Sequence, residues 1–182
     1  MVGEAELFVA AERMLAEVMG RIRPGDRDVV AGPVLDRPGW DAPAPLHEWT
    51  ARWVADDREL TTLLGGTPPD PADDGADDRA NVVDAACAVV RTPDARMVAD
   101  LLPEATALRC FLAHDVAMAL GSRACPLPED LARGMFERTE PDAQRWRDSG
   151  MFRARLPLPA GHVSWRDQFL LLAGRDPHPF LD

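Results

Sequence analysis

Apolar residues recur at steps of three and four along several stretches of the chain, the spacing that places side chains on one face of an α-helix. In the first stretch this pattern runs from Leu7 to Ile22 and stops just before Pro24 and Gly25, which break helices. The predicted long helices cover residues 4–22, 45–64, 77–90 and 103–121, and shorter helical patterns cover 128–137 and 141–148.

No segment shows the paired alternation typical of strands, so the sequence predicts an all-α fold. Four long helices joined by loops favour an antiparallel four-helix bundle. Prolines followed by the apolar run 169–173 predict that residues 150–182 form an extended C-terminal arm and a short helix. The 182 residues suffice for one compact core, and we expect 1–182 to be a single domain.

Composition narrows the choice of partners. The 31 acidic and 20 basic residues give a net charge of -11, which would repel nucleic-acid phosphates and anionic lipids, so we expect no nucleic-acid partner. No stretch approaches the roughly 20 apolar residues of a membrane span, and the N-terminus lacks a signal sequence. We therefore expect a cytoplasmic protein without a membrane partner.

Two details of composition bear on chemistry. All basic residues are Arg, and the absence of Lys excludes Schiff-base catalysis through a lysine amine. The three cysteines are an odd set at wide spacing, which favours reduced thiols over a disulfide framework. The acidic segment 65–78 is rich in Pro, Gly and Asp without periodicity, and we interpret it as a solvated loop.

Three segments carry a family resemblance. Residues 146–179 end in the motif GRDP at 174–177, residues 37–46 read RPGWDAPAPL, and residues 114–121 read HDVAMALG. Together they resemble actinobacterial DinB-like proteins related to mycothiol-dependent maleylpyruvate isomerase. The resemblance implies a DinB-like bundle, isomerase or S-transferase chemistry on a small molecule, and mycothiol as a cofactor.

Proteins of that family are similar to bundles that bind a divalent metal through a His on the second helix and an acidic residue and a His, four apart, on a later helix. In this chain the second-helix position falls on Glu48, with His47 one residue earlier. Without a gap, the later positions fall on Leu108 and Leu112, which cannot bind a metal. That alignment predicts a protein without the metal.

A second alignment deletes two residues and brings Cys110 and His114 to the four-residue spacing. It predicts a site of His47 or Glu48 with Cys110 and His114, ligands that favour zinc. Against it, deleting two residues rotates the rest of a helix by about 200 degrees. The sequence leaves both alternatives open.

The predicted ligand pocket lies in the bundle between the second and fourth long helices. We expect His114 and Asp115 to be the catalytic candidates. The candidates for substrate binding are His47, Trp53 and Asp56.

Three carboxylates, Asp56, Asp57 and Asp115, also have structural interpretations. Asp56 and Asp57 either face inward, where a carboxylate needs a partner, or lie in solvent, which we favour. Asp115 is either a general base or a group that holds Arg109 or a backbone amide, and we favour the structural role.

We therefore expect a small-molecule enzyme, or a relative of such an enzyme, of the mycothiol-dependent isomerase and S-transferase group, acting without a metal. One alternative is a zinc-dependent thiol transferase or isomerase. Another is a non-catalytic bundle that binds a ligand or self-associates, and a homodimer would form if the apolar run 169–173 docks on a second copy.

Overall fold

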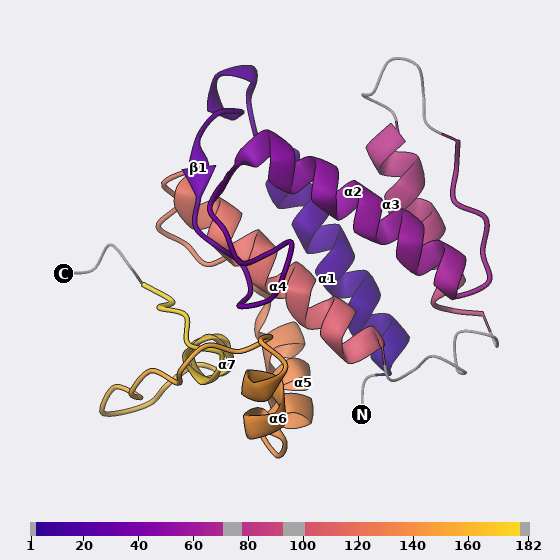
Figure 1. The fold of residues 1–182 in the computed structure, drawn as a ribbon. Coiled ribbons are helices and arrows are strands. Elements are labelled where there is room, and N and C mark those ends of the chain that lie inside the picture. Colours follow the sequence, from indigo (N-terminus) through magenta and orange to yellow (C-terminus); the bar gives the residue numbers. More distant parts are fainter. Residues whose placement is uncertain (1–2, 71–77, 93–100, 179–182) are drawn as a thin grey trace.

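The computed structural model describes residues 3–70, 78–92 and 101–178, and this part of the chain is mostly helical, which confirms the all-α class (Figure 1). Its α-helices are α1 (Glu4–Met19), α2 (Leu46–Leu63), α3 (Asp78–Val89), α4 (Leu102–Ala119), α5 (Glu129–Thr139), α6 (Ala143–Asp148) and α7 (Trp165–Leu172). A single 3-10 turn, η1, spans Pro24–Asp26.

The helices end close to where the sequence predicts, because local signals stop them. At the end of α4, Gly121 has a φ of +76°, and its N–H donates to the Met118 carbonyl at 2.9 Å. The Ser122 N–H donates to the Ala117 carbonyl at 2.9 Å, which completes a glycine cap. At the start of α7, the Ser164 hydroxyl accepts the Asp167 N–H at 3.1 Å.

The prediction of no strand pairing is wrong at one place. Strand β1 (Val30–Ala31) pairs antiparallel with β2 (Ala44–Pro45), directly before α2. Two residues are too few to leave an alternating pattern in the sequence. The pairing therefore depends on how the connection between α1 and α2 folds back.

Helix α4 is the central element of the fold. Every side chain from Thr106 to His114 is buried, so α4 is covered on all sides. Helix α1 packs along α4, while α3 contacts both α1 and α2 (Figure 1). These four helices contribute most of the core that surrounds the candidate site.

The C-terminal region packs against α4 through aromatic side chains. Phe111 of α4 stacks on Phe169 of α7 with 5.5 Å between ring centroids, and its ring meets Phe152 edge-on at 5.8 Å. The arm before α7 is irregular and runs beside the end of that helix, where the Leu156 N–H donates to the Leu171 carbonyl at 2.9 Å. The described C-terminal part is thus an irregular arm and a short helix.

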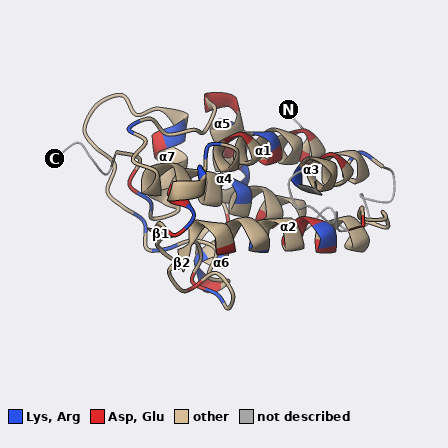
Figure 2. Cartoon of the chain, turned by 90° about the horizontal axis from the view of Figure 1, so that it is seen from above, with Lys and Arg blue, Asp and Glu red and all other residues tan. Residues whose placement is uncertain are grey.

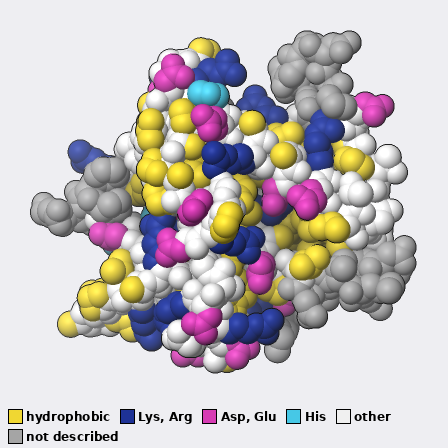
Figure 3. Space-filling model, viewed as in Figure 1, with side chains coloured by type: hydrophobic (Ala, Val, Ile, Leu, Met, Phe, Trp, Pro, Cys, Tyr) yellow, Lys and Arg dark blue, Asp and Glu magenta, His cyan; other side chains and the backbone are white. Residues whose placement is uncertain are grey.

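Charged residues of both signs are interspersed on the ribbon and on the face drawn in Figure 3 (Figures 2 and 3). Within the predicted acidic loop 65–78, residues 71–77 lie outside the described part of the chain. None of the helices described here is long and apolar enough to cross a membrane.

Candidate functional site

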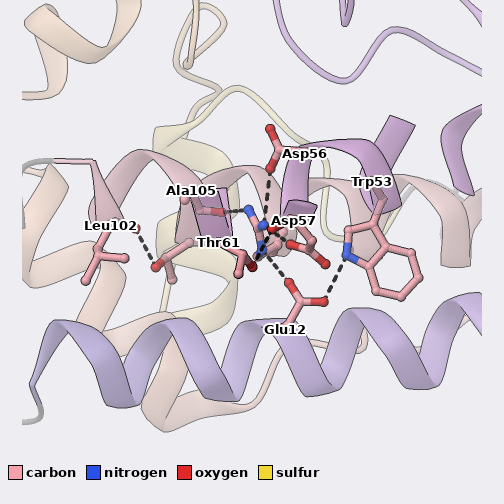
Figure 4. A network of polar contacts seen from close by, with 9 residues as sticks. Glu12, Trp53, Asp56, Asp57, Thr61, Leu102 and Ala105 are labelled. Atoms are coloured by element: carbon pink, nitrogen blue, oxygen red, sulfur yellow. Dashed lines mark hydrogen bonds and ion pairs between the residues drawn. The ribbon is translucent and has the colours of Figure 1, made fainter. Parts of the chain in front are cut away.

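A buried charged cluster joins α1, α2 and α4 (Figure 4). The guanidinium of Arg109 on α4 is 1% exposed, and it contacts the carboxylates of Glu12 on α1 and Asp57 on α2, which are both fully buried. Its Nη2 also lies 3.1 Å from Oδ2 of Asp56, whose side chain is 33% exposed. The cluster thus extends from the core to the surface at Asp56.

Several further contacts fix the geometry of the cluster. Trp53 on α2 donates its indole N–H to Oε1 of Glu12 at 2.9 Å. Arg109 donates through Nη1 to the Ala105 carbonyl at 2.9 Å, and its guanidinium lies 4.6 Å from the ring centroid of Phe8. Because both charged and aromatic partners hold the guanidinium, it has one defined position.

The charges in the cluster do not balance. Two fully buried carboxylates face one guanidinium, and an uncompensated charge in the core is costly. Burial raises the pKa of Asp57 well above its usual range; Arg109 opposes this rise and Glu12 adds to it. Asp57 therefore retains its proton at pH values where an ordinary aspartate is ionised.

The pKa values of Arg109 and of Cys87 on α3 are raised as well, for different reasons. Burial alone would lower the pKa of Arg109, but Asp57 and Glu12 raise it on balance, so the guanidinium stays charged. Cys87 on α3 faces the same region: burial and the nearby Glu12 raise the pKa of its thiol to about 11. Cys87 is therefore a protonated, poorly reactive thiol.

A cleft of about 330 Å³ adjoins this cluster between α1, α2 and α3. Trp53 connects the cleft to the charged cluster, since it lines the cleft and its indole N–H donates a hydrogen bond to Glu12. The residues that line the cleft are Ala16, Met19, Gly20, Trp53, Arg79, Ala80, Val83 and Asp84. The sequence predicted a pocket between α2 and α4 instead, but there the structure places Arg109 and its carboxylate partners.

Of the residues expected to bind substrate, Trp53 and Asp56 lie in the cluster and His47 does not. Our preference for a solvated pair of acids is wrong for Asp57, which is fully buried and paired with Arg109. His47 lies at the start of α2, where its Nδ1 is 2.9 Å from the Arg27 carbonyl and its side chain is 43% exposed.

The predicted catalytic residues His114 and Asp115 lie elsewhere and hold the C-terminal segment. Nε2 of His114 is 3.1 Å from the Asp176 carbonyl, and burial lowers the pKa of the ring. Asp115 lies 3.4 Å from Nε of the buried Arg175, whereas we expected its structural partner to be Arg109 or a backbone amide. Both residues line a shallow surface cleft of about 360 Å³, separate from the cluster.

The motifs that carry the family resemblance therefore have architectural roles. Arg175 of GRDP donates to the Val34 carbonyl and lies 3.8 Å from the ring centroid of Phe111. Gly174 has a φ of +74°, and a Cβ there would lie 2.5 Å from the Ala154 carbonyl oxygen. Trp40 of the PGW segment stacks on Trp49 at 5.3 Å.

The predicted metal ligands do not come together. Cys110 is fully buried in the apolar core, and burial raises the pKa of its thiol, which disfavours the thiolate that zinc requires. Glu48 pairs with Arg52 at 3.3 Å on the surface, and Nε2 of His114 is already used. No group of three or more potential ligands that could hold a metal occurs among residues 3–70, 78–92 and 101–178. The residues present do not fit the metal that the resemblance implies.

Sequence reasoning missed Glu12 and assigned Arg109 to a different partner. A signal existed for both: Glu12 lies in the apolar stripe of α1 between Phe8 and Leu15, and Arg109 interrupts the apolar run of α4. A single charge of each sign inside two buried stripes predicts a pair.

Comparison of the chain with protein-family models, with curated proteins and with solved structures finds no match.

Proposed function

We propose that this protein is a metal-independent small-molecule-binding protein of the DinB-like four-helix-bundle kind, related to mycothiol-dependent isomerases and S-transferases. Its ligand would occupy the cleft between α1, α2 and α3. The observation that carries the proposal is that Trp53 lines this cleft and donates to Glu12 of the buried cluster.

The cluster supports chemistry as well as binding. A carboxyl group with a raised pKa next to a carboxylate and a fixed cation is a group suited to hold and release a proton. Asp57 does not line the cleft, so it would act through Glu12 and Trp53 as a positioning group. Perturbed ionisable groups beside a cleft are a common property of active sites.

Mass spectrometry of the purified protein after denaturation tests the binding function. We expect a copurified small molecule, or a thermal-shift response to a metabolite set that includes mycothiol, in the wild type. Ala80→Phe should abolish it, because exposed Ala80 lines the cleft and the larger side chain fills it. Ala88→Phe is the matched control: Ala88 is exposed on the same helix but does not line the cleft. Equal binding by both variants would contradict the proposal.

Metal analysis of untagged protein separates this proposal from the zinc alternative. We expect no stoichiometric transition metal in the wild type, because no three potential ligands come together among the residues that the structure describes. Stoichiometric zinc that is lost in His114→Ala would overturn metal independence.

A further inference from the structure

The cleft between α1, α2 and α3 has an apolar interior and charges at its rim. Ala16, Met19, Val83 and Trp53 form apolar walls, and Trp53 is only 3% exposed. A volume of about 330 Å³ is at the small end for ligand pockets, so the cleft suits a body of one or two rings.

Arg79 and Asp84 are the charged residues that line this cleft. Arg79 is half-buried, and within the described part of the chain its guanidinium has no hydrogen bond or ion pair. Asp84 is exposed, so water and salt screen its charge more effectively than that of Arg79. The half-buried guanidinium therefore dominates the recognition of a charged ligand.

Among the described residues, the two fully buried carboxylates of the cluster do not reverse this preference. Glu12 and Asp57 lie behind Trp53, are fully buried, and are neutralised by Arg109 and by the proton that Asp57 retains. Arg79 also belongs to the first turn of α3, where the helix dipole favours an anion. The charge of Arg79 and the dipole of α3 therefore both favour an anion at the same end of the cleft.

We propose that the cleft recognises a small organic anion whose flat apolar body packs against Trp53, Met19 and Val83 and whose carboxylate pairs with Arg79. This inference rests on the proposed function, since it names the class of ligand for the same cleft. A carboxylate matches the guanidinium fork, and an apolar body gains by leaving water.

A matched set of probes tests the charge preference. The probes are 2-naphthoate, the neutral 2-naphthamide and the cationic 2-naphthylmethylammonium, which share one ring system, and binding is measured by calorimetry with quenching of tryptophan fluorescence. We expect 2-naphthoate to bind most tightly. Arg79→Gln should weaken 2-naphthoate about tenfold and leave 2-naphthamide unchanged, because a charge-assisted hydrogen bond is lost. Arg91→Gln, an exposed arginine beyond the end of α3, should change neither probe.

The outcomes separate the two proposals. If Ala80→Phe weakens all three probes but the wild type binds 2-naphthoate no better than 2-naphthamide, the preference for an anion is wrong and the binding cleft stands. Tighter binding of the cationic probe would overturn the preference in the same way. If no probe binds, or if Ala80→Phe changes nothing, the cleft is not a ligand site and both proposals fail. Circular dichroism of each variant verifies that it is folded.

Discussion

Asp57 lies in the core, whereas an ordinary aspartate lies in solvent. Its side chain is fully buried, its Oδ1 contacts Arg109, and burial raises the pKa of its carboxyl well above the usual range. The single positive charge of Arg109 compensates only one of the two buried carboxylates. The carboxylate of Asp56 also lies near this guanidinium, but it is partly exposed to solvent. The arrangement is stable because the proton on Asp57 removes the second negative charge from the core.

This proton makes stability depend on pH in an unusual direction. The pKa of Asp57 is raised in the folded state, whereas an unfolded aspartate titrates near about 4. As pH rises above about 4, the unfolded chain loses this proton and the folded protein keeps it, so this group lowers the free energy of unfolding by up to about 1.4 kcal/mol per pH unit until the folded pKa is reached. Asp57→Asn does not titrate and removes this contribution.

Urea unfolding of the wild type and of Asp57→Asn between pH 4 and pH 8 measures the effect. We expect the stability of the wild type relative to the variant to decrease as pH rises. Asp56→Asn, which changes the partly exposed neighbour, should retain the pH dependence of the wild type. A difference between wild type and Asp57→Asn that stays constant over this range would show that Asp57 is ionised in the fold.

At the scale of elements, α4 organises the molecule through its two halves. Its first half carries Arg109 into the charged cluster, and its second half carries His114 and Asp115 to the C-terminal segment. Phe111 between them stacks on α7. The candidate site and the docking of the C-terminus therefore depend on one helix that is buried on all sides.

Gly174 tests how tightly the C-terminal segment is fixed. Gly174→Ala combines a positive φ with a Cβ placed 2.5 Å from the Ala154 carbonyl oxygen, and we expect it to lower the free energy of unfolding by about 3 kcal/mol. Gly161→Ala is the control, because Gly161 also has a positive φ, +105°, but has open space around it. It should cost only about 1 kcal/mol.

Urea unfolding and limited proteolysis of the C-terminal segment measure both variants. Equal losses for Gly174→Ala and Gly161→Ala would mean that the close approach to Ala154 relaxes without cost.

At the scale of the whole molecule, the segment that we expected to form a homodimer contact, residues 169–173, already packs inside the chain. Residues 169–173 are buried within the chain itself, so they are not free to dock on a second copy. In the part of the chain that the structure describes, the large exposed hydrophobic residues are dispersed over several elements: Val29, Val30, Leu63, Leu101, Leu158 and Trp165. Exposed apolar residues that are scattered in this way do not make an interface.

We therefore expect a monomer of 19.9 kDa in light scattering coupled to size-exclusion chromatography. The net charge of -11 adds repulsion between copies, so the mass should not rise at low salt. A mass near twice this value at micromolar concentration would show that some other surface associates.

Local patterns in the sequence are sufficient to predict which segments form the long helices and where these helices end. Periodic apolar residues and the break at Gly121 act locally, so the predicted bounds of α1, α2, α3 and α4 lie within three residues of those observed. Local signals also suffice to predict that Trp53 is a core residue, since it lies in the apolar stripe of α2.

Which charges pair in the core depends on how the helices pack against one another. Glu12, Asp57 and Arg109 are far apart in the sequence, and their pairing depends on the packing and rotation of three helices about their axes. The same rotation places Asp57 inside and leaves Asp56 at the surface, and it directs His114 to the C-terminal segment and away from Trp53. Periodicity specifies the buried face of each helix, whereas the partner across that face is set by packing between helices.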